Sequence, residues 1–376
     1  MLLSQDQEMV RDAVRTFARE QLWPNAGRWD KEHHFSREAH RGLAELGAYG
    51  ICVPEQYGGA NLDYLTLALV LEEIAAGDGG TSTAISVTNC PVNAILMAFG
   101  NDAQKQQWLT PLAQGKMLGA FALTEPHVGS DASALRTTAT RDKDGYVLNG
   151  VKQFITSGKN GQVAIVIAVT DKGAGKKGMS AFLVPTDAPG YQVARLEDKL
   201  GQRSSDTAQI NLDNCRIPLE NLIGQEGQGY RIALGGLEGG RIGIAAQSVG
   251  MARSAFEVAL DYAKQRESFG KTIFEHQAVG FRLADCATRI EAARQLIWHA
   301  ASLRDAGRPC LKEAAMAKLF ASEMAEQVCS AAIQTLGGYG YVEDFPVERI
   351  YRDVRVCQIY EGTSDVQKIL IQRALA

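Results

Sequence analysis

The chain of 376 residues lacks several features that would define its class at once. Its seven cysteines show no CxxC spacing, which predicts reduced core thiols rather than a disulfide framework or a zinc site. The net charge is −4 with no long basic run, so a nucleic-acid partner is not favoured. The most apolar run, Val163 to Val169, is far shorter than the roughly 18 residues of a membrane span.

The N-terminal residues of the sequence do not show the pattern of a targeting segment, and no metal motif follows them. Residues 1–6 lack the basic region and apolar core of a signal peptide, and transit-peptide character is absent. We therefore expect a cytoplasmic protein that binds no membrane. His33, His34 and His40 have no HExxH pattern or acidic partners, so we expect solvated surface histidines and no metal site.

The glycine-rich stretches do not match the known nucleotide-binding motifs. Gly224, Gly227 and Gly229 are not in GxGxxG order, and no βαβ pattern surrounds them. The stretch 173–178 is followed by Met179 where a P-loop needs serine or threonine, so we interpret it as a hairpin loop. No GxSxG elbow occurs, which weakens acyl hydrolysis as a function.

Residues 1 to about 120 show the apolar spacing of helices. Met9, Ala13 and Phe17 recur near helical spacing, and Ser36 opens a further helix that Gly47 closes. Glycine and proline separate the remaining segments. We expect helices over residues 5–21, 36–47, 62–76, 81–100 and 102–114.

From about residue 121 to about residue 225 the pattern is that of strands. Asn149-Gly150, between Tyr146–Leu148 and Val151–Thr156, is the strongest hairpin signal in the chain. Further strands are expected at 163–170, 179–184 and 208–212. Strands do not alternate with helices here, so we predict an antiparallel β domain.

From about residue 226 the pattern is helical again. One apolar face is formed by Leu283, Ala287, Ile290, Ala293, Ile297 and Ala300. Leu311 to Leu336 forms another long helix, which Gly337-Gly338 stops. The predicted fold class is α+β, mainly α, with an N-terminal helical domain (1–120), a middle antiparallel β domain (121–225) and a C-terminal four-helix bundle (226–376).

One stretch near the C-terminus has the composition of a site for a general base. Glu361 lies between the aromatic ring of Tyr360, which raises the cost of ionising it, and Gly362, which lets a ligand approach the backbone. Thr363 and Ser364 are good N-cap residues for the run 365–375. We therefore expect Glu361 on a turn at a helix entrance, which suits a general base. Taken alone, the stretch is more typical of an exposed turn glutamate.

Four blocks of sequence accompany this stretch in a fixed order. They are Phe121 to Asp131, Lys152 to Ser157, Arg266 to Gly270 with Gln277, and Gln334 to Tyr341, continuing through Arg349 and Asp353 to Ser364. In this order and at these spacings, the chain resembles the acyl-CoA dehydrogenases, FAD enzymes of fatty-acid and branched amino-acid breakdown. The resemblance covers essentially the whole chain.

The resemblance implies a catalytic role for Glu361, which matches the family base that removes the α-proton of an acyl thioester. Some relatives place the base before the arginine that matches Arg241, but this chain has Gly240 there. Glu238 lies two residues earlier, and a helix turns about 200° over two residues, so we expect it to face elsewhere. The substrate-binding residues implied are Ser130, Glu238, Arg241, Tyr360 and Gly362.

The same resemblance implies a bound FAD. Thr124 offers its hydroxyl, Phe154 packs on the flavin ring, and Arg266 pairs with the pyrophosphate of the FAD in a neighbouring subunit. FAD then bridges subunits, which implies a dimer at least, and the resemblance implies a homotetramer. The cofactor-binding residues implied are Phe121, Leu123, Thr124, Gly129, Ser130, Phe154, Ile155, Thr156, Arg266, Phe269, Gln277, Gln334, Gly337, Gly338, Thr363 and Asp365.

Several positions depart from the family pattern. His127-Val128 replaces small residues, Phe154 stands where many relatives have tryptophan, and Asp365 replaces a more usual glutamate or glutamine. Residues 81–87 contain no arginine of the kind that relatives acting on glutaryl-CoA use for the distal carboxylate. A dicarboxylic substrate is therefore not expected.

The function implied is FAD-dependent α,β-dehydrogenation of a short or short-branched acyl-CoA, with electrons passing to an electron-transfer flavoprotein. One alternative is an acyl-CoA oxidase that uses dioxygen, which the motifs do not separate from a dehydrogenase. Another is a non-catalytic flavin protein of this fold that binds nucleic acid. The acidic balance and the presence of Glu361 argue against that second alternative.

Overall fold

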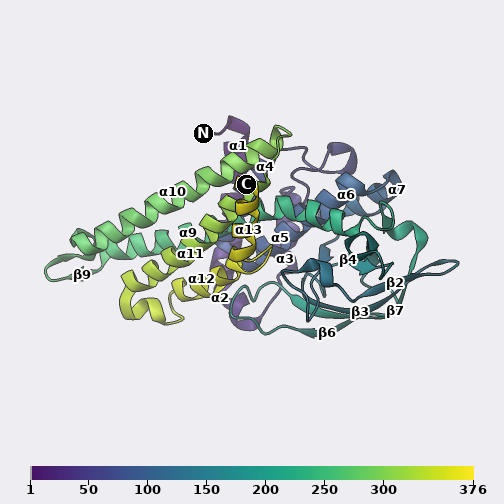
Figure 1. Ribbon diagram of the computed structural model, residues 1–376. Helices are drawn as coiled ribbons and strands as arrows, with labels where there is room; N and C mark the ends of the chain where they lie inside the picture. Colours follow the sequence, from purple (N-terminus) through teal and green to yellow (C-terminus); the bar gives the residue numbers. More distant parts are fainter. Residues whose placement is uncertain (1) are drawn as a thin grey trace.

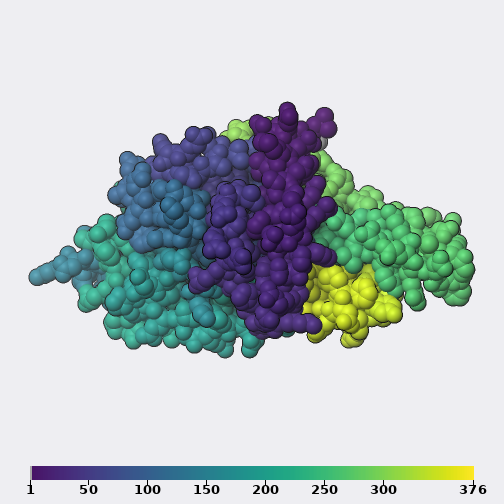
Figure 2. Space-filling view, turned by 180° about the vertical axis from the view of Figure 1, so that it is seen from behind, coloured from purple at the N-terminus to yellow at the C-terminus, as the bar shows by residue number. Residues whose placement is uncertain are grey.

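Helices form both ends of the chain and strands form its middle, as Figure 1 shows for the computed structural model, which describes residues 2–376. This order of elements confirms the predicted fold class, α+β and mainly α. Figure 2 shows the opposite face, where the N-terminal segment (purple) runs between the sheet region (teal) and the long C-terminal helices (green). The helical parts therefore pack on one another although they are far apart in sequence.

Several of the N-terminal helices begin at side-chain caps. Ser4 and Ser36 accept hydrogen bonds at the starts of α1 and α3, and Asp63 does so at the start of α4. The α2 helix was not predicted; Pro24 lies in its first turn, where a missing N–H costs nothing. The α-helices here are α1 (Gln5–Phe17), α2 (Trp23–Glu32), α3 (Arg37–Glu45), α4 (Tyr64–Gly77), α5 (Gly79–Val87), α6 (Ala94–Phe99), α7 (Asp102–Gln104) and α8 (Thr110–Ala113).

His40 is an exception to the predicted surface histidines. It is only 6 % exposed, stacks on Phe35 with ring centroids 4.3 Å apart, and is bonded through Nδ1 to the Tyr49 hydroxyl. Burial lowers the pKa of His40 to about 3, with a smaller contribution from the charge of Arg37. The prediction of a solvated His40 is therefore wrong, because the aromatic residues around it supply a packed niche.

The helical segment 79–99 is the one stretch in residues 2–376 that is long and apolar enough to cross a membrane by length and composition alone. Of its most apolar window, 72 % is buried inside the protein. It has the character of a core helix, enclosed by other parts of the chain.

Strands β1 to β8 form one mixed sheet with the order β6-β7-β3-β2-β4-β5-β8, in which β1 pairs with β4. Most pairings are antiparallel as predicted, but β1 and β2 both run parallel to β4. The strands are β1 (Gly119–Ala122), β2 (Thr138–Arg141), β3 (Gly145–Thr156), β4 (Val163–Val169), β5 (Met179–Pro185), β6 (Tyr191–Leu196), β7 (Thr207–Pro218) and β8 (Leu222–Ile223).

The predicted hairpin at Asn149-Gly150 is wrong. Both residues lie inside the continuous strand β3, at a register shift against β7. Gly150 has φ +152°, and a Cβ there would lie 2.4 Å from the Thr137 hydroxyl. The dipeptide therefore forms a β-bulge, at which the backbone of Gly150 closely approaches Thr137. Glycine is favoured in such a bulge for the same conformational freedom that favours it in a tight turn.

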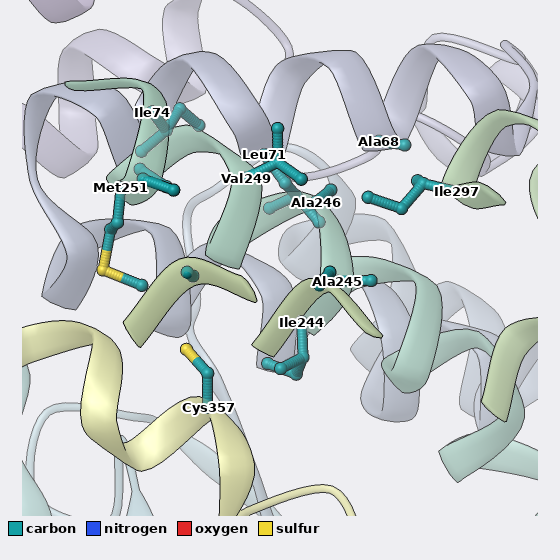
Figure 3. Packing of buried hydrophobic residues seen from close by; sticks show 14 of the residues in the cluster. Ala68, Leu71, Ile74, Ile244, Ala245, Ala246, Val249, Met251, Ile297 and Cys357 are labelled. Atoms are coloured by element: carbon teal, nitrogen blue, oxygen red, sulfur yellow. The ribbon is translucent and has the colours of Figure 1, made fainter. Parts of the chain in front are cut away.

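The C-terminal part is built on long helices that pack against α4, and Figure 3 shows this core between α4, α9 and α10. The predicted face on α10 is correct except for one position: Ala287 is exposed and Cys286 is buried instead. The elements are α9 (Gly229–Gln265), β9 (Glu267–Ser268), β10 (Lys271–Thr272), α10 (Gln277–Asp305), α11 (Leu311–Leu336), α12 (Val347–Val354) and α13 (Ser364–Leu375).

All seven cysteines are free thiols, and six of them are buried. This agrees with the predicted reduced core thiols.

Candidate active site

Glu361 lies on the turn that enters α13, as the sequence predicts. Thr363 is the N-cap of that helix, and its hydroxyl accepts a hydrogen bond from the Val366 N–H at 3.3 Å. Glu361 has φ +54° and Gly362 has φ +92°. A left-handed conformation is unfavourable for glutamate, so the surrounding structure must hold this turn in place.

The carboxylate of Glu361 points at the backbone of α9. A Cβ added at Gly240 would lie 2.8 Å from the Glu361 carboxylate carbon and from each carboxylate oxygen. Glycine at position 240 therefore makes the room in which the side chain lies. Among residues 2–376, the buried Oε2 atom of Glu361 has no hydrogen-bond partner, and the Glu361 N–H has none either.

Burial controls the proton affinity of this carboxylate. It raises the pKa of Glu361 to about 7, while the nearby charges of Arg241 and Lys318 oppose the rise. Neither charge lies within 4.0 Å of the carboxylate in the described chain, so no ion pair ties up the base. A carboxylate that titrates near neutrality and is free of partners is suited to accept a proton from a ligand.

The hydroxyl of Tyr360, the residue before Glu361, ties the Glu361 turn to other parts of the fold. It donates to Gln247 Oε1 at 3.0 Å and accepts from Gln202 Nε2 at 3.3 Å, and it lies 3.4 Å from the Thr83 hydroxyl. Thr83 is on α5, Gln202 lies in the loop between β6 and β7, and Gln247 is on α9, so all three parts of the fold meet here. The Tyr360 hydroxyl therefore anchors the turn through polar contacts, and its role as an apolar wall beside Glu361 stays a prediction.

Lys318 is a site residue that the sequence analysis missed. Its side chain is fully buried in α11, and its Nζ donates to the Gly362 carbonyl at 2.8 Å. Burial lowers the pKa of Lys318 to about 8. A lysine in a long helix usually faces solvent, but Lys318 shares its face with Ala314, Ala317 and Ala321, and this spacing was the available signal.

Glu238 and Arg241 take different directions from α9. Glu238 accepts from Cys310 Sγ at 3.3 Å and lies 3.6 Å from Arg304, so it faces α10 and α11, as expected of a residue that is not the base. Arg241 is 5 % exposed, and its Nε and Nη1 have no partner in the part of the chain described. Burial lowers the pKa of Arg241, and the charges of Glu361 and Glu238 oppose this. A buried guanidinium with free donors is ready to hold an anionic or carbonyl group.

One group of the predicted cofactor residues gathers where β1 and β3 end. The Gln153 N–H donates to the Thr124 carbonyl at 2.9 Å, and Lys152 Nζ donates to the Leu123 carbonyl at 3.0 Å. These bonds bring the loop after β1, which continues to Gly129 and Ser130, beside the last residues of β3. Phe121 lies on β1 itself.

The side chains at the end of β3 do not all face the same way. Phe154 is 62 % exposed and has φ +59°, whereas Ile155 is 1 % exposed and lies in the core of the sheet. Ile155 can therefore meet a ligand only through its main chain. The hydroxyls of Thr124, Ser130 and Thr156 have no hydrogen-bond partner among the described residues.

A buried ion pair lies under this loop and was not predicted. Lys152 Nζ is 2.9 Å from Glu125 Oε1, and both side chains are almost completely buried. Glu125 also accepts the N–H groups of Arg136 at 2.8 Å and Thr137 at 3.0 Å. His127, one of the departures from the family pattern, lies 3.6 Å from the same carboxylate. The pair thus fixes the loop that carries Gly129 and Ser130.

A second group of predicted cofactor residues lies at the far end of the molecule. Arg266, Gly337 and Gly338 line one groove of about 790 Å³, and Gln334 lines another of about 680 Å³. Phe269 is 95 % exposed on the hairpin of β9 and β10, and Gln277 follows that hairpin. Figure 1 places β9 at one end of the molecule and the sheet at the other, so the two groups do not meet within one copy.

The residues of both groups fit a flavin dinucleotide. In residues 2–376, the side chains of Arg266, Gln277 and Gln334 form no hydrogen bond or ion pair, and a Cβ at Gly337 or Gly338 would meet nothing within 4 Å. A free guanidinium beside open glycines suits a pyrophosphate. Thr363 caps α13 as predicted, while the exposed Asp365 lies 3.8 Å from Lys368.

Comparisons with known proteins cover nearly the whole chain. Models of the acyl-CoA dehydrogenase N-terminal, middle and C-terminal domains match residues 4–116, 120–215 and 227–376. The chain is 46 % identical to the mitochondrial short-chain specific acyl-CoA dehydrogenase of Rattus norvegicus, over 98 % of this chain and 90 % of that protein. It is 47 % identical to an acyl-CoA dehydrogenase of Bacillus subtilis, over 100 % and 99 % of the two chains.

Solved structures are similar over the whole chain. Butyryl-CoA dehydrogenase from Megasphaera elsdenii matches with a TM-score of 0.98 at 40 % identity, covering 100 % of this chain and 99 % of that one. A chain in a structure of the electron transferring flavoprotein of Acidaminococcus fermentans matches with a TM-score of 0.99 at 45 % identity, covering the same shares.

Proposed function

Because the chain belongs to the acyl-CoA dehydrogenase family, we propose that it catalyses the FAD-dependent α,β-dehydrogenation of a short acyl-CoA, with Glu361 as the catalytic base. The observation that carries this proposal is the state of Glu361: a half-buried side chain whose carboxylate has a pKa of about 7 and whose buried Oε2 atom has no partner. Membership of the family supports the reaction, and the geometry of the turn before α13 supports Glu361 as its base.

Glu361 has two groups that a thioester substrate needs. Its carboxylate can remove the α-proton, which a thioester carbonyl acidifies only modestly. Its N–H, which has no acceptor within residues 2–376, can donate to the carbonyl oxygen on which negative charge develops. Base and oxyanion donor therefore come from one residue, and the positive φ of Glu361 sets their relative direction.

Burial gives the base its strength. Substrate entry removes further water from the carboxylate, so the pKa of Glu361 rises and the residue becomes a better proton acceptor. Arg241 and Lys318 keep enough of the residue ionised to act near neutral pH, because their charges oppose the effect of burial. Burial and the charges of Arg241 and Lys318 together give Glu361 a pKa near neutral pH, where a general base is most effective.

We also propose the residues that hold FAD, which when bound accepts the β-hydride. Thr124, Ser130 and Thr156 offer free hydroxyls at the sheet, and the exposed ring of Phe154 offers a face for stacking. Arg266, with the groove at Gly337-Gly338, would take the pyrophosphate of the FAD bound mainly by a second copy. The wide separation of the two groups in Figure 1 supports this bridging, and hence an assembly of at least two copies; we propose the homotetramer that the family resemblance implies.

The proposal of a short acyl chain depends on the names of the relatives. The Rattus norvegicus relative is named as short-chain specific and the Megasphaera elsdenii structure as a butyryl-CoA dehydrogenase. An electron-transfer flavoprotein is the proposed acceptor, supported by the likeness to a chain in a structure of such a protein.

The test is anaerobic titration of the purified holoprotein with a panel of acyl-CoAs, following the bleaching of the flavin. We expect butyryl-CoA to bleach it, and isobutyryl-CoA, isovaleryl-CoA and 2-methylbutyryl-CoA should be compared under the same conditions. No bleaching by any of them would refute the proposal. Peroxide formed in air without an added acceptor would favour the oxidase over the dehydrogenase.

A further inference from the structure

Lys318 is fully buried in the middle of α11, and the chemistry described above leaves its hydrogen bond without a purpose. Burying an ammonium group is unfavourable unless partners compensate for the lost water. Within residues 2–376, no carboxylate lies within 4.0 Å of Lys318, and its only hydrogen bond is to the Gly362 carbonyl at 2.8 Å. Because burying the Lys318 ammonium group costs free energy, its role is to be found in the hydrogen bond that it donates to the Gly362 carbonyl.

The Gly362 carbonyl belongs to a turn that needs support. Two successive residues, Glu361 and Gly362, have positive φ values of 54° and 92°. Lys318 and Gln367 both donate to the Gly362 oxygen at 2.8 Å, and Gln367 Nε2 also lies 3.2 Å from the Glu361 carbonyl. These donors hold the carbonyls of the two peptide planes that follow Glu361, and so they restrain the backbone that carries its carboxylate.

We propose that Lys318 is a positioning residue for the reaction: its ammonium group holds the Gly362 carbonyl, orients Glu361 against the thioester, and favours the ionised form of that base. This inference rests on the proposed function of Glu361. The charge of Lys318 opposes the effect of burial on the pKa of Glu361, second to Arg241. The groups that face Lys318 itself include Cys357 before the turn, Arg241 on α9 and Glu323 on its own helix.

The experiment compares Lys318→Met with wild-type holoprotein and with Lys312→Met as the matched control. Lys312 is at the exposed start of the same helix, 38 % exposed in its side chain, so its substitution removes one positive charge without touching the turn. Single-turnover flavin reduction by butyryl-CoA is followed from about pH 6 to about pH 9.

We expect Lys318→Met to lower the rate at neutral pH by at least about tenfold and to move the midpoint of the pH profile upward, because the base loses both its orientation and a stabilising charge. Lys312→Met should match wild type. Lys318→Arg, which keeps the charge, should restore the midpoint more fully than the rate, since a guanidinium fits the lysine niche poorly.

A normal rate and midpoint in Lys318→Met would overturn the inference. If that variant does not fold, Lys318→Gln decides: the amide can still donate to Gly362, so an upward midpoint supports the inference and an unchanged one overturns it. A wild-type protein that no acyl-CoA bleaches refutes the proposed function itself. Normal bleaching in wild type together with normal behaviour of the Lys318 variants refutes only the role of Lys318.

Discussion

Replacing Glu361 with glutamine changes the reaction and the stability of the fold in opposite directions. The amide keeps the shape of the side chain but has no basic oxygen. We expect single-turnover flavin reduction by butyryl-CoA to fall by about 10²-fold to 10⁴-fold, the usual contribution of a positioned base. We expect the same variant to be more resistant to unfolding at neutral and alkaline pH.

The gain in stability follows from the cost of ionising a buried carboxylate. The pKa of Glu361 rises from 4.5 to about 7, which at about 1.36 kcal/mol per pH unit corresponds to about 3 kcal/mol. Below pH 4.5 the proton is bound in both the folded and the unfolded state, so the cost is absent. Between pH 4.5 and about 7 only the unfolded state ionises readily, and above about 7 the full cost weakens the wild-type fold.

Glutamine does not ionise and so avoids this cost. Its amide still occupies a site where one oxygen of Glu361 has no partner, which reduces the expected gain to about 1–3 kcal/mol. Thermal unfolding of the two holoproteins at about pH 5 and about pH 8 measures the effect: the gap in Tm should be small at the lower pH and several degrees at the higher one.

The control is Glu313→Gln, a change from carboxylate to amide at the solvent end of α11, whose side chain is 21 % exposed. It should change neither the rate nor the pH dependence of Tm. Near-full turnover of Glu361→Gln with intact flavin would refute the assignment of the base. A Tm gap that does not vary with pH would show that burial does not control the protonation of Glu361.

Three further predictions test the packing and charge around the site. Gly240→Ala puts a Cβ 2.8 Å from the Glu361 carboxylate and should slow flavin reduction at least about tenfold, whereas Gly235→Ala on the same helix, with its nearest neighbour at 3.6 Å, should not. The wild-type rate of flavin reduction at low substrate should rise with pH up to about pH 7, because only the ionised Glu361 accepts a proton; a flat profile between about pH 5 and about pH 7 would contradict this. Lys152→Met leaves the buried Glu125 without its counter-charge and should lower the unfolding free energy by about 3–5 kcal/mol in denaturant titrations. The double variant with Glu125→Gln should recover part of that loss, and equal losses in the single and double variants would argue against the ion pair.

Local patterns predicted most of the elements because they depend on neighbours in sequence. The helix from Leu311 to Leu336 ends at Gly337, where φ is +64°, as the Gly-Gly stop predicts. Strands β4 and β5 were predicted from short apolar runs that both faces of the sheet bury. Where the predictions failed, a neighbour distant in sequence decided: Thr137 and β7 make a bulge of Asn149-Gly150.

The candidate site divides in the same way. The turn at Glu361 and its cap Thr363 follow from local chemistry, and the family resemblance pointed to the same glutamate. Lys318 was missed, because nothing local distinguishes a buried lysine from a solvated one except its alanine neighbours. The failure at Ala287, where Cys286 is buried instead, has a similar origin, since the exact face of a long helix depends on what packs against it.

The sequence by itself determined that a glutamate stands on a glycine-containing turn before a capped helix, within a chain of helical, strand and helical parts. The tertiary structure alone decided how strongly that glutamate holds its proton. The reason is physical: proton affinity depends on lost water and on charges close in space, and Gly240, Arg241 and Lys318 reach Glu361 from helices that are distant from it in the chain.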